Sequence, residues 1–159
     1  MNENRNDLLL SKDDQVILGE LDEESLTPQV RRHAQSPSNW GKMLQPNGEA
    51  TVTGICEDTI SIQLRLTNNA IEEIKFRTDG CGFTRACASV ATELALGQKL
   101  DFALEFTGAQ IVEALGDLPK AHRHCADLAA NALKGAATDA LARRRNPWSH
   151  FFRSGKKLK

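Results

Sequence analysis

The chain has 159 residues, a formal net charge of −1 at pH 7 and an apolar fraction of 40%. This length suits one domain with polar ends, and the charge gives no global electrostatic case for nucleic-acid binding. The charge is uneven, since residues 1–24 carry eight acids against two bases and residues 143–159 carry seven bases and no acid. Nothing in the sequence is typical of a signal peptide or a membrane span, and we expect a cytoplasmic protein.

The first predicted elements are polar and short. Residues 1–24 are predicted to be an acidic extension, in which residues 16–18 are compatible with a short helix or strand. Thr27 and Pro28 are typical of a helix start, as the cap and the first-turn residue. The polar residues 36–39 are predicted to end this helix, and residues 46–48 to form a turn.

A small antiparallel sheet is predicted next. Residues 59–67 alternate apolar and polar side chains, which indicates a strand with one buried face, formed by Ile60, Ile62, Leu64 and Leu66. Asn68 and Asn69 tolerate positive φ and suit a tight hairpin. The partner strand follows with its alternation over residues 73–78, and a third strand near residues 49–55 completes the sheet.

Helical periodicity begins after Gly82, and Gly97 is predicted to close the first of these helices. Residues 101–106 and 109–115 indicate two shorter helices, which residues 116–119 end. The last helix has a small-residue stripe of Cys125, Leu128, Ala129, Ala132, Ala136 and Ala140. A sheet followed by helices predicts an α+β domain over residues 25–142, between the acidic extension and a basic tail, 143–159.

Three cysteines lie at predicted junctions of this domain. Cys56 falls at a turn between strands, Cys81 between two glycines at a helix start, and Cys125 at another helix start. Asp58 and His124 stand beside them. Thiols near the positive end of a helix dipole are stabilised as thiolates, the form that binds metal. Scattered thiols with a carboxylate and an imidazole therefore predict a soft-metal site assembled by folding.

A simpler interpretation stays open for each residue. The three cysteines could be unrelated small hydrophobic residues, with Asp58 a turn residue and His124 a surface histidine. Cys87 shares a helix face with Val90 and is predicted to be buried in the core, with a role as reserve ligand or sulfur acceptor as the alternative.

Together these segments resemble the iron–sulfur cluster scaffold family of the NifU N-terminal domain and IscU. The resemblance covers most of residues 25–142. Its motifs, in order, are residues 33–41, Cys56-Glu57-Asp58, Gly80-Cys81-Gly82 followed by residues 86–94, and residues 115–119 followed by His124-Cys125-Ala126.

The resemblance implies a three-stranded antiparallel sheet packed against a helical layer. It also implies that Cys56, Cys81 and Cys125 assemble a labile [2Fe–2S] cluster, with Asp58 and His124 as further metal ligands. In the family a cysteine desulfurase supplies the sulfur, and the finished cluster passes to apo iron–sulfur clients. The protein would then be a carrier and not an enzyme; whether two protomers share the cluster as a homodimer stays open.

The chain also departs from the family pattern. Glu57 replaces a glycine, and Cys87 stands where serine is usual. The residues after Pro119 differ from the IscU motif that a specialised chaperone binds, so recognition by that chaperone is not favoured. These departures indicate a divergent, NifU-like member.

Two rival functions remain. In related zinc-binding members, the three cysteines and Asp58 hold Zn²⁺, and a thiol accepts persulfide from a desulfurase. A second rival is an adaptor that binds the desulfurase and carries no cluster.

The basic tail interleaves aromatic residues, which suits RNA, an acidic partner or a membrane surface, but we favour a solvated tail and expect neither a membrane nor a nucleic-acid partner.

Overall fold

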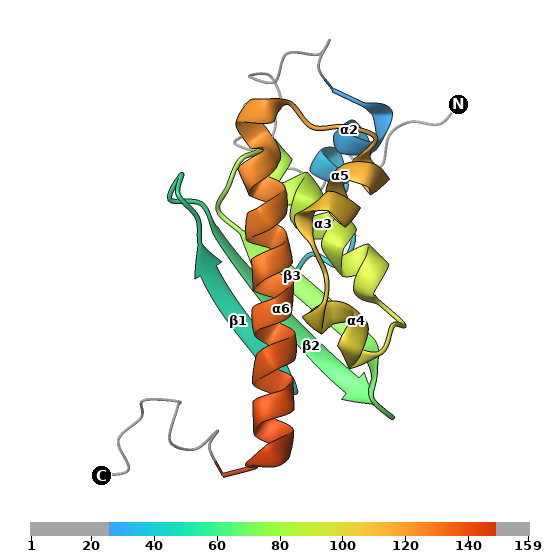
Figure 1. Cartoon of the computed structure of the whole chain (residues 1–159), viewed down its shortest axis with the longest axis vertical. Coiled ribbons are helices and arrows are strands. Elements are labelled where there is room, and N and C mark those ends of the chain that lie inside the picture. The colour runs from blue at the N-terminus through green and yellow to red at the C-terminus, as the bar shows by residue number, and fades with distance from the viewer. Residues whose placement is uncertain (1–25, 149–159) are drawn as a thin grey trace.

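A computed structural model describes residues 26–148 as an α+β domain, as predicted (Figure 1). A three-stranded sheet precedes most of the helices in the chain. The elements are α2 (Pro28–Gln35), β1 (Gly48–Thr53), β2 (Thr59–Thr67), β3 (Ala70–Thr78), α3 (Gly82–Ala95), α4 (Leu100–Leu104), α5 (Gly108–Leu115), the 3₁₀ turn η2 (Lys120–His122) and α6 (Arg123–Arg145). Within this part of the chain, none of the helices is both long and apolar enough to cross a bilayer.

The sheet is antiparallel with the order β1-β2-β3, and β2 has the predicted bounds. The predicted alternation is confirmed for Ile60, Ile62 and Leu64, which are completely buried. Leu66, the fourth predicted member of this face, is only partly buried and follows a register shift after Arg65. The hairpin to β3 turns through Asn68 and Asn69, both with positive φ, at 52° and 65°. Two adjacent residues of this conformation give the type I′ turn that matches the twist of the flanking strands.

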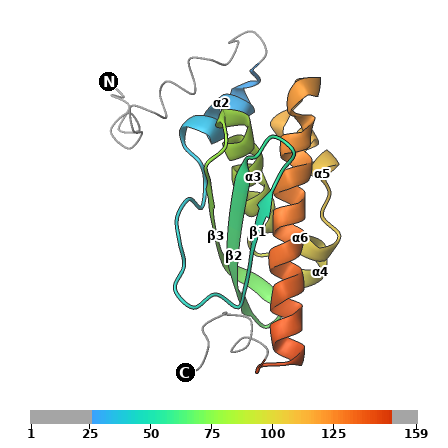
Figure 2. The same ribbon diagram turned by 90° about the vertical axis from the view of Figure 1, so that its left-hand side faces the viewer.

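The helices cover one face of this sheet. Figure 1 shows α6 crossing the sheet, with α3, α4 and α5 beside it. On the opposite face, the segment between α2 and β1 runs along the sheet (Figure 2) and is tied to it where Met43 N–H donates to Gln63 Oε1 at 2.8 Å. The buried core therefore lies between the sheet and the helices.

α6 approaches β1 unusually closely. A Cβ added at Gly48 would lie 2.3 Å from the Ala136 carbonyl oxygen, and one at Gly135 would lie 2.9 Å from the Ala50 Cβ. Small residues on both elements allow this approach. The predicted small-residue stripe is confirmed, since all six of its members are buried.

The helix ends follow their capping chemistry. Thr27 Oγ1 accepts a hydrogen bond from Val30 N–H at 3.1 Å, which confirms the predicted start of α2, and Gly97 has φ +83° just after α3. α6 continues past residue 142, where the basic tail was predicted to begin. Arg143 belongs to its last turn. The Arg143 guanidinium pairs with Asp139 one turn earlier, at 2.9 Å, and with Glu49 of β1, at 3.2 Å.

A buried histidine anchors the segment after α2. His33 Nδ1 lies 2.7 Å from Ser89 Oγ, which also accepts from Ser38 N–H at 2.8 Å. Burial lowers the pKa of His33, with the neighbouring Arg32 charge as a second cause, so its neutral form is favoured. This part of the family-like motif therefore holds α2 against α3.

The predictions for residues 16–18 and for the aromatic residues of the tail beyond 148 lie outside the described residues.

Candidate functional site

Cys81 stands at the junction of the sheet and the helical layer. It is the N-cap residue of α3, directly after the turn that leaves β3, and is partly buried. Gly80 is required before it, because a Cβ there would lie 2.7 Å from both Asp58 Oδ2 and the Thr84 side chain. The backbone at this junction is therefore pressed against the groups that surround the thiol.

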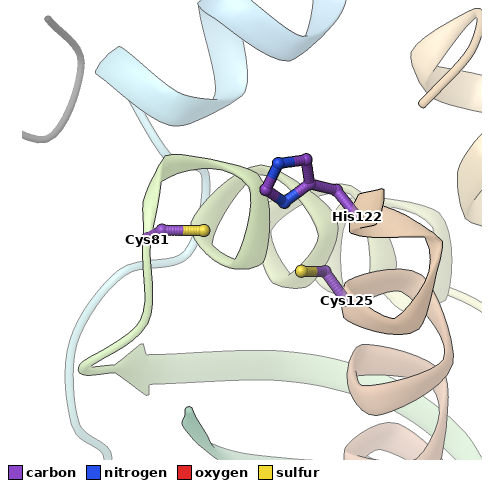
Figure 3. A group of neighbouring side chains, drawn as sticks. All are labelled: Cys81, His122 and Cys125. Atoms are coloured by element: carbon purple, nitrogen blue, oxygen red, sulfur yellow. The ribbon is translucent and has the colours of Figure 1, made fainter. Parts of the chain in front are cut away.

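Cys125 approaches Cys81 from the other side. It lies in the first turn of α6 and is 1% exposed, and Figure 3 shows the two thiols pointing toward one another. A hydrogen bond from Cys125 lowers the pKa of Cys81, against the opposing effect of its burial. The same hydrogen bond, with burial, raises the pKa of Cys125. The geometry favours one thiolate, on Cys81, stabilised by one thiol.

Thr84 connects the acidic and sulfur groups of the site. Its hydroxyl is completely buried and lies 2.7 Å from Asp58 Oδ2, 3.3 Å from Cys125 Sγ and 3.6 Å from Cys81 Sγ. One hydroxyl carries one hydrogen, and the short distance to the carboxylate favours donation to Asp58. Thr84 was not among the predicted site residues, although its place three residues after Cys81 puts both on one face of α3.

Cys56 occupies a different environment. It is exposed in the turn between β1 and β2, where Gly54 N–H donates to the Asp58 carbonyl oxygen at 2.8 Å. That turn ends β1 before residue 55, earlier than predicted. Glu57 within it has φ +67°, a conformation that glycine adopts without strain. The structure thus brings Asp58, Cys81 and Cys125 together and carries Cys56 beside them on the exposed turn.

Two histidines flank Cys125. His124 Nε2, from the predicted site, lies 3.6 Å from Cys125 Sγ. His122 was not among the predicted site residues, yet its ring nitrogen and the sulfurs of Cys81 and Cys125 all lie within 4.8 Å of one another (Figure 3). Its position three residues before a helical cysteine was the available signal, since that spacing places both side chains on one side of the turn.

Cys87 is separate from these groups. It is completely buried in α3, as predicted, and burial is the first cause that raises the pKa of its thiol. A neutral, inaccessible thiol packs as a small apolar side chain.

The fold and the site define a class of small α+β domain in which helix starts bring two thiols and an imidazole close together. The sequence profile of the NifU-like N terminal domain matches residues 25–146. The chain therefore belongs to the NifU-like N-terminal domain family.

Relatives and solved structures agree with this assignment. The iron–sulfur cluster assembly scaffold protein IscU 1 of Archaeoglobus fulgidus is 44% identical over 108 residues, which cover 67% of this chain and 71% of that protein. The mitochondrial iron sulfur cluster assembly protein 2 of Saccharomyces cerevisiae is 36% identical over 127 residues, covering 76% and 80%. The crystal structure of a NifU-like N-terminal protein of Brucella abortus matches with TM-score 0.58 at 16% identity, covering 74% and 94%, and supports the fold.

The contact between the two thiols predicts an unusual pH dependence of alkylation at Cys81. In metal-free Cys56→Ser protein, we expect the iodoacetamide reaction of Cys81 to have its midpoint below the ordinary cysteine pKa, because the thiolate reacts and the Cys125 hydrogen bond stabilises it. Adding Cys125→Ala should move that midpoint to higher pH. Mass spectrometry of the Cys81 peptide measures both profiles, and coincident midpoints would contradict the assigned hydrogen bond.

The positive φ of Glu57 predicts that Glu57→Gly stabilises the protein. The left-handed conformation costs a residue with a Cβ about 1–2 kcal/mol, and the greater unfolded-state entropy of glycine offsets part of the gain. We expect a net increase in unfolding free energy of roughly 0.5–1 kcal/mol by urea denaturation. Glu57→Ala removes the same charge but keeps the Cβ, so it should show no gain, and equal stabilisation by both variants would point to the charge instead.

Proposed function

We propose that this protein is a scaffold that assembles a labile [2Fe–2S] cluster on Cys56, Cys81 and Cys125. In this proposal a cysteine desulfurase supplies the sulfur, and the finished cluster is transferred to apo-proteins. The protein acts as a carrier and has no turnover of its own. The observation that carries the proposal is the convergence of Cys81, Cys125 and Asp58 from three different elements, with Cys56 on the adjoining turn.

The donor set fits this cargo. Iron–sulfur clusters are held by cysteine thiolates, and the predicted ligands supply three. Family membership and relatives named as IscU scaffold proteins support the same function. Asp58 and His124 supply the non-thiolate ligands nearest to Cys81 and Cys125 in the predicted set.

Three thiolates with an oxygen or nitrogen ligand should hold a cluster less firmly than four thiolates, which suits a protein that must release it. The contact of the partly buried Asp58 carboxylate with the Thr84 hydroxyl supports this role, because that hydroxyl lies 3.3 Å from Cys125 Sγ and 3.6 Å from Cys81 Sγ. A carboxylate can leave the metal and return to the Thr84 hydroxyl without being left unpaired.

The alternative is a zinc-binding sulfur acceptor that works with a desulfurase. The specific observation in its favour is the close approach of two sulfurs and an imidazole nitrogen, since such a donor set also suits Zn²⁺. In this alternative, a cysteine thiol of the site accepts the persulfide sulfur.

Metal and sulfide content tests the proposal. Protein purified without oxygen, or reconstituted with ferrous iron, cysteine, a desulfurase and a thiol reductant that reduces the persulfide sulfur to sulfide, should contain near-equal iron and acid-labile sulfide and show a visible charge-transfer band. Cys81→Ser should lose both, since it removes a thiolate at the centre of the site. Stoichiometric zinc, no sulfide and failed reconstitution would contradict the scaffold function and favour the zinc alternative.

The role of Asp58 gives a second prediction. Asp58→Ala should carry a longer-lived cluster and transfer it to an apo-ferredoxin several-fold more slowly, because the exchangeable carboxylate is gone. Circular dichroism of the acceptor measures the transfer rate. Asp101→Ala, which alters an exposed aspartate of α4, is the control and should transfer like wild type. Equal rates for Asp58→Ala and wild type would exclude a role of Asp58 in release.

A further inference from the structure

The face of the sheet that points away from the helices carries a row of polar side chains. In the antiparallel register, Ser61 of β2 pairs with Thr51 of β1 and with Arg77 of β3. Because Ile60 and Ile62 are buried on the helical side, the residue between them points to the opposite face. Residues paired across neighbouring strands share a face, so Thr51, Ser61 and Arg77 form one row across the sheet.

The segment between α2 and β1 runs over this face (Figure 2). Gly41 N–H donates to the Phe76 carbonyl oxygen at 2.9 Å, which holds the segment beside β3, and Gly41 has φ +140°, a conformation that other residues rarely adopt. Two residues later, Met43 N–H is bonded to Gln63 of β2, so Lys42 lies where the segment crosses from one strand to the next. Between this segment and the polar row is a groove of about 250 Å³.

The groove has an excess of positive charge. Lys42 and Arg77 both line it, and neither has an ion pair or a side-chain hydrogen bond with another residue of the range 26–148. Glu49 lines the groove as well, but its carboxylate is engaged by Arg143 at 3.2 Å and by Gln63 Nε2 at 3.2 Å. Even with this carboxylate counted in full, the two cations leave the groove with a net positive charge.

The polar row also supplies a hydroxyl hydrogen. Thr51 Oγ1 and Ser61 Oγ lie 2.8 Å apart, and one of the two hydroxyls donates to the other. The hydrogen of the accepting hydroxyl is left for a ligand. A guanidinium, an ammonium and a hydroxyl donor together suit an anion with several acceptor oxygens.

We propose that this groove binds the phosphate group of a small phosphorylated compound or inorganic phosphate itself, with Arg77 as the forked ligand and Lys42 as the second cation. The planar guanidinium matches two phosphate oxygens, and the remaining hydroxyl hydrogen is available to another. A groove of about 250 Å³ is smaller than the pockets that hold drug-sized ligands and suits a phosphate with a few attached atoms. The lining residues are distinct from those of the thiol site, so the groove is a second site, on the open face of the sheet.

NMR titration of the metal-free full chain with sodium phosphate, at pH 7 and low ionic strength, tests this site. The backbone amides of Lys42 and Ser61 and the side-chain Nε–H of Arg77 should shift and saturate with one common dissociation constant. The amides of Cys81 and Cys125 should stay at their phosphate-free positions. Because salt screens exposed charges, added sodium chloride should weaken the binding. Absence of saturable shifts at the three groove groups through the millimolar range would overturn the proposal.

Variants separate a built site from a diffuse surface charge. Arg77→Gln removes the charge and the fork of an exposed side chain and should weaken phosphate binding about 10-fold. Lys42→Gln should weaken it several-fold. Lys75→Gln is the matched control, because Lys75 is a base of the same sheet face that does not line the groove, and it should lose less than about 2-fold. Equal losses in Arg77→Gln and Lys75→Gln would overturn the assignment to a site.

The source of the phosphate group is tested by comparing O-phosphoserine with inorganic phosphate. Tighter binding of O-phosphoserine assigns the groove to a phosphate monoester, and equal or weaker binding assigns it to the free anion. Either assignment requires the loss in Arg77→Gln. These titrations use metal-free protein, so failure of the phosphate site is distinguished from failure of cluster assembly, which is measured as iron and sulfide.

Discussion

The close packing of α6 on β1 is the constraint on which the site depends. α6 carries Cys125 in its first turn, and the helix can bring that thiol to Cys81 only if it lies almost against the sheet. Gly48 and Gly135 permit this approach, since a Cβ at either would meet the opposite element within 2.9 Å. A helix lined by leucines here would stand further from the strands and would move its whole first turn away from α3.

A single buried hydroxyl organises the polar part of the site. Thr84 has one hydrogen and three possible acceptors within 3.6 Å, so it can donate to Asp58 or to one of the sulfurs, but not to both at once. A partly buried carboxylate left without that bond would carry a desolvation cost. Any ligand that withdraws Asp58 frees the Thr84 hydrogen for a thiolate, and any new negative charge on sulfur competes with Asp58 for it. The carboxylate and the thiols are thereby coupled through one side chain.

Local sequence patterns predicted most of the fold. The alternation of β2 and the Asn68–Asn69 turn gave the exact bounds of β2, because period and turn chemistry agreed. β3 begins at Ala70, before the alternation predicted over residues 73–78. β1 ends earlier than expected, because the next backbone donor, the Gly54 N–H, bonds the Asp58 carbonyl oxygen and closes the turn. Thr84 and His122 were not predicted as site residues for a different reason, since neither stands out in its own segment. Thr84 contacts Asp58, 26 residues away, and His122 lies near Cys81, 41 residues away, so their place in the site depends on the fold.

The donor groups differ in access, and this difference has a chemical consequence. Cys56 is exposed, Cys81 and His122 are partly buried, and Cys125 is 1% exposed at the base of the site. A large partner can therefore touch Cys56 directly, whereas Cys125 is reached only by small groups that pass the other donor side chains. Under the proposed scaffold function, exchange with a partner should begin at the turn that carries Cys56 and Asp58, because loss of a buried thiolate ligand first would leave an unpaired charge in the least solvated part of the site.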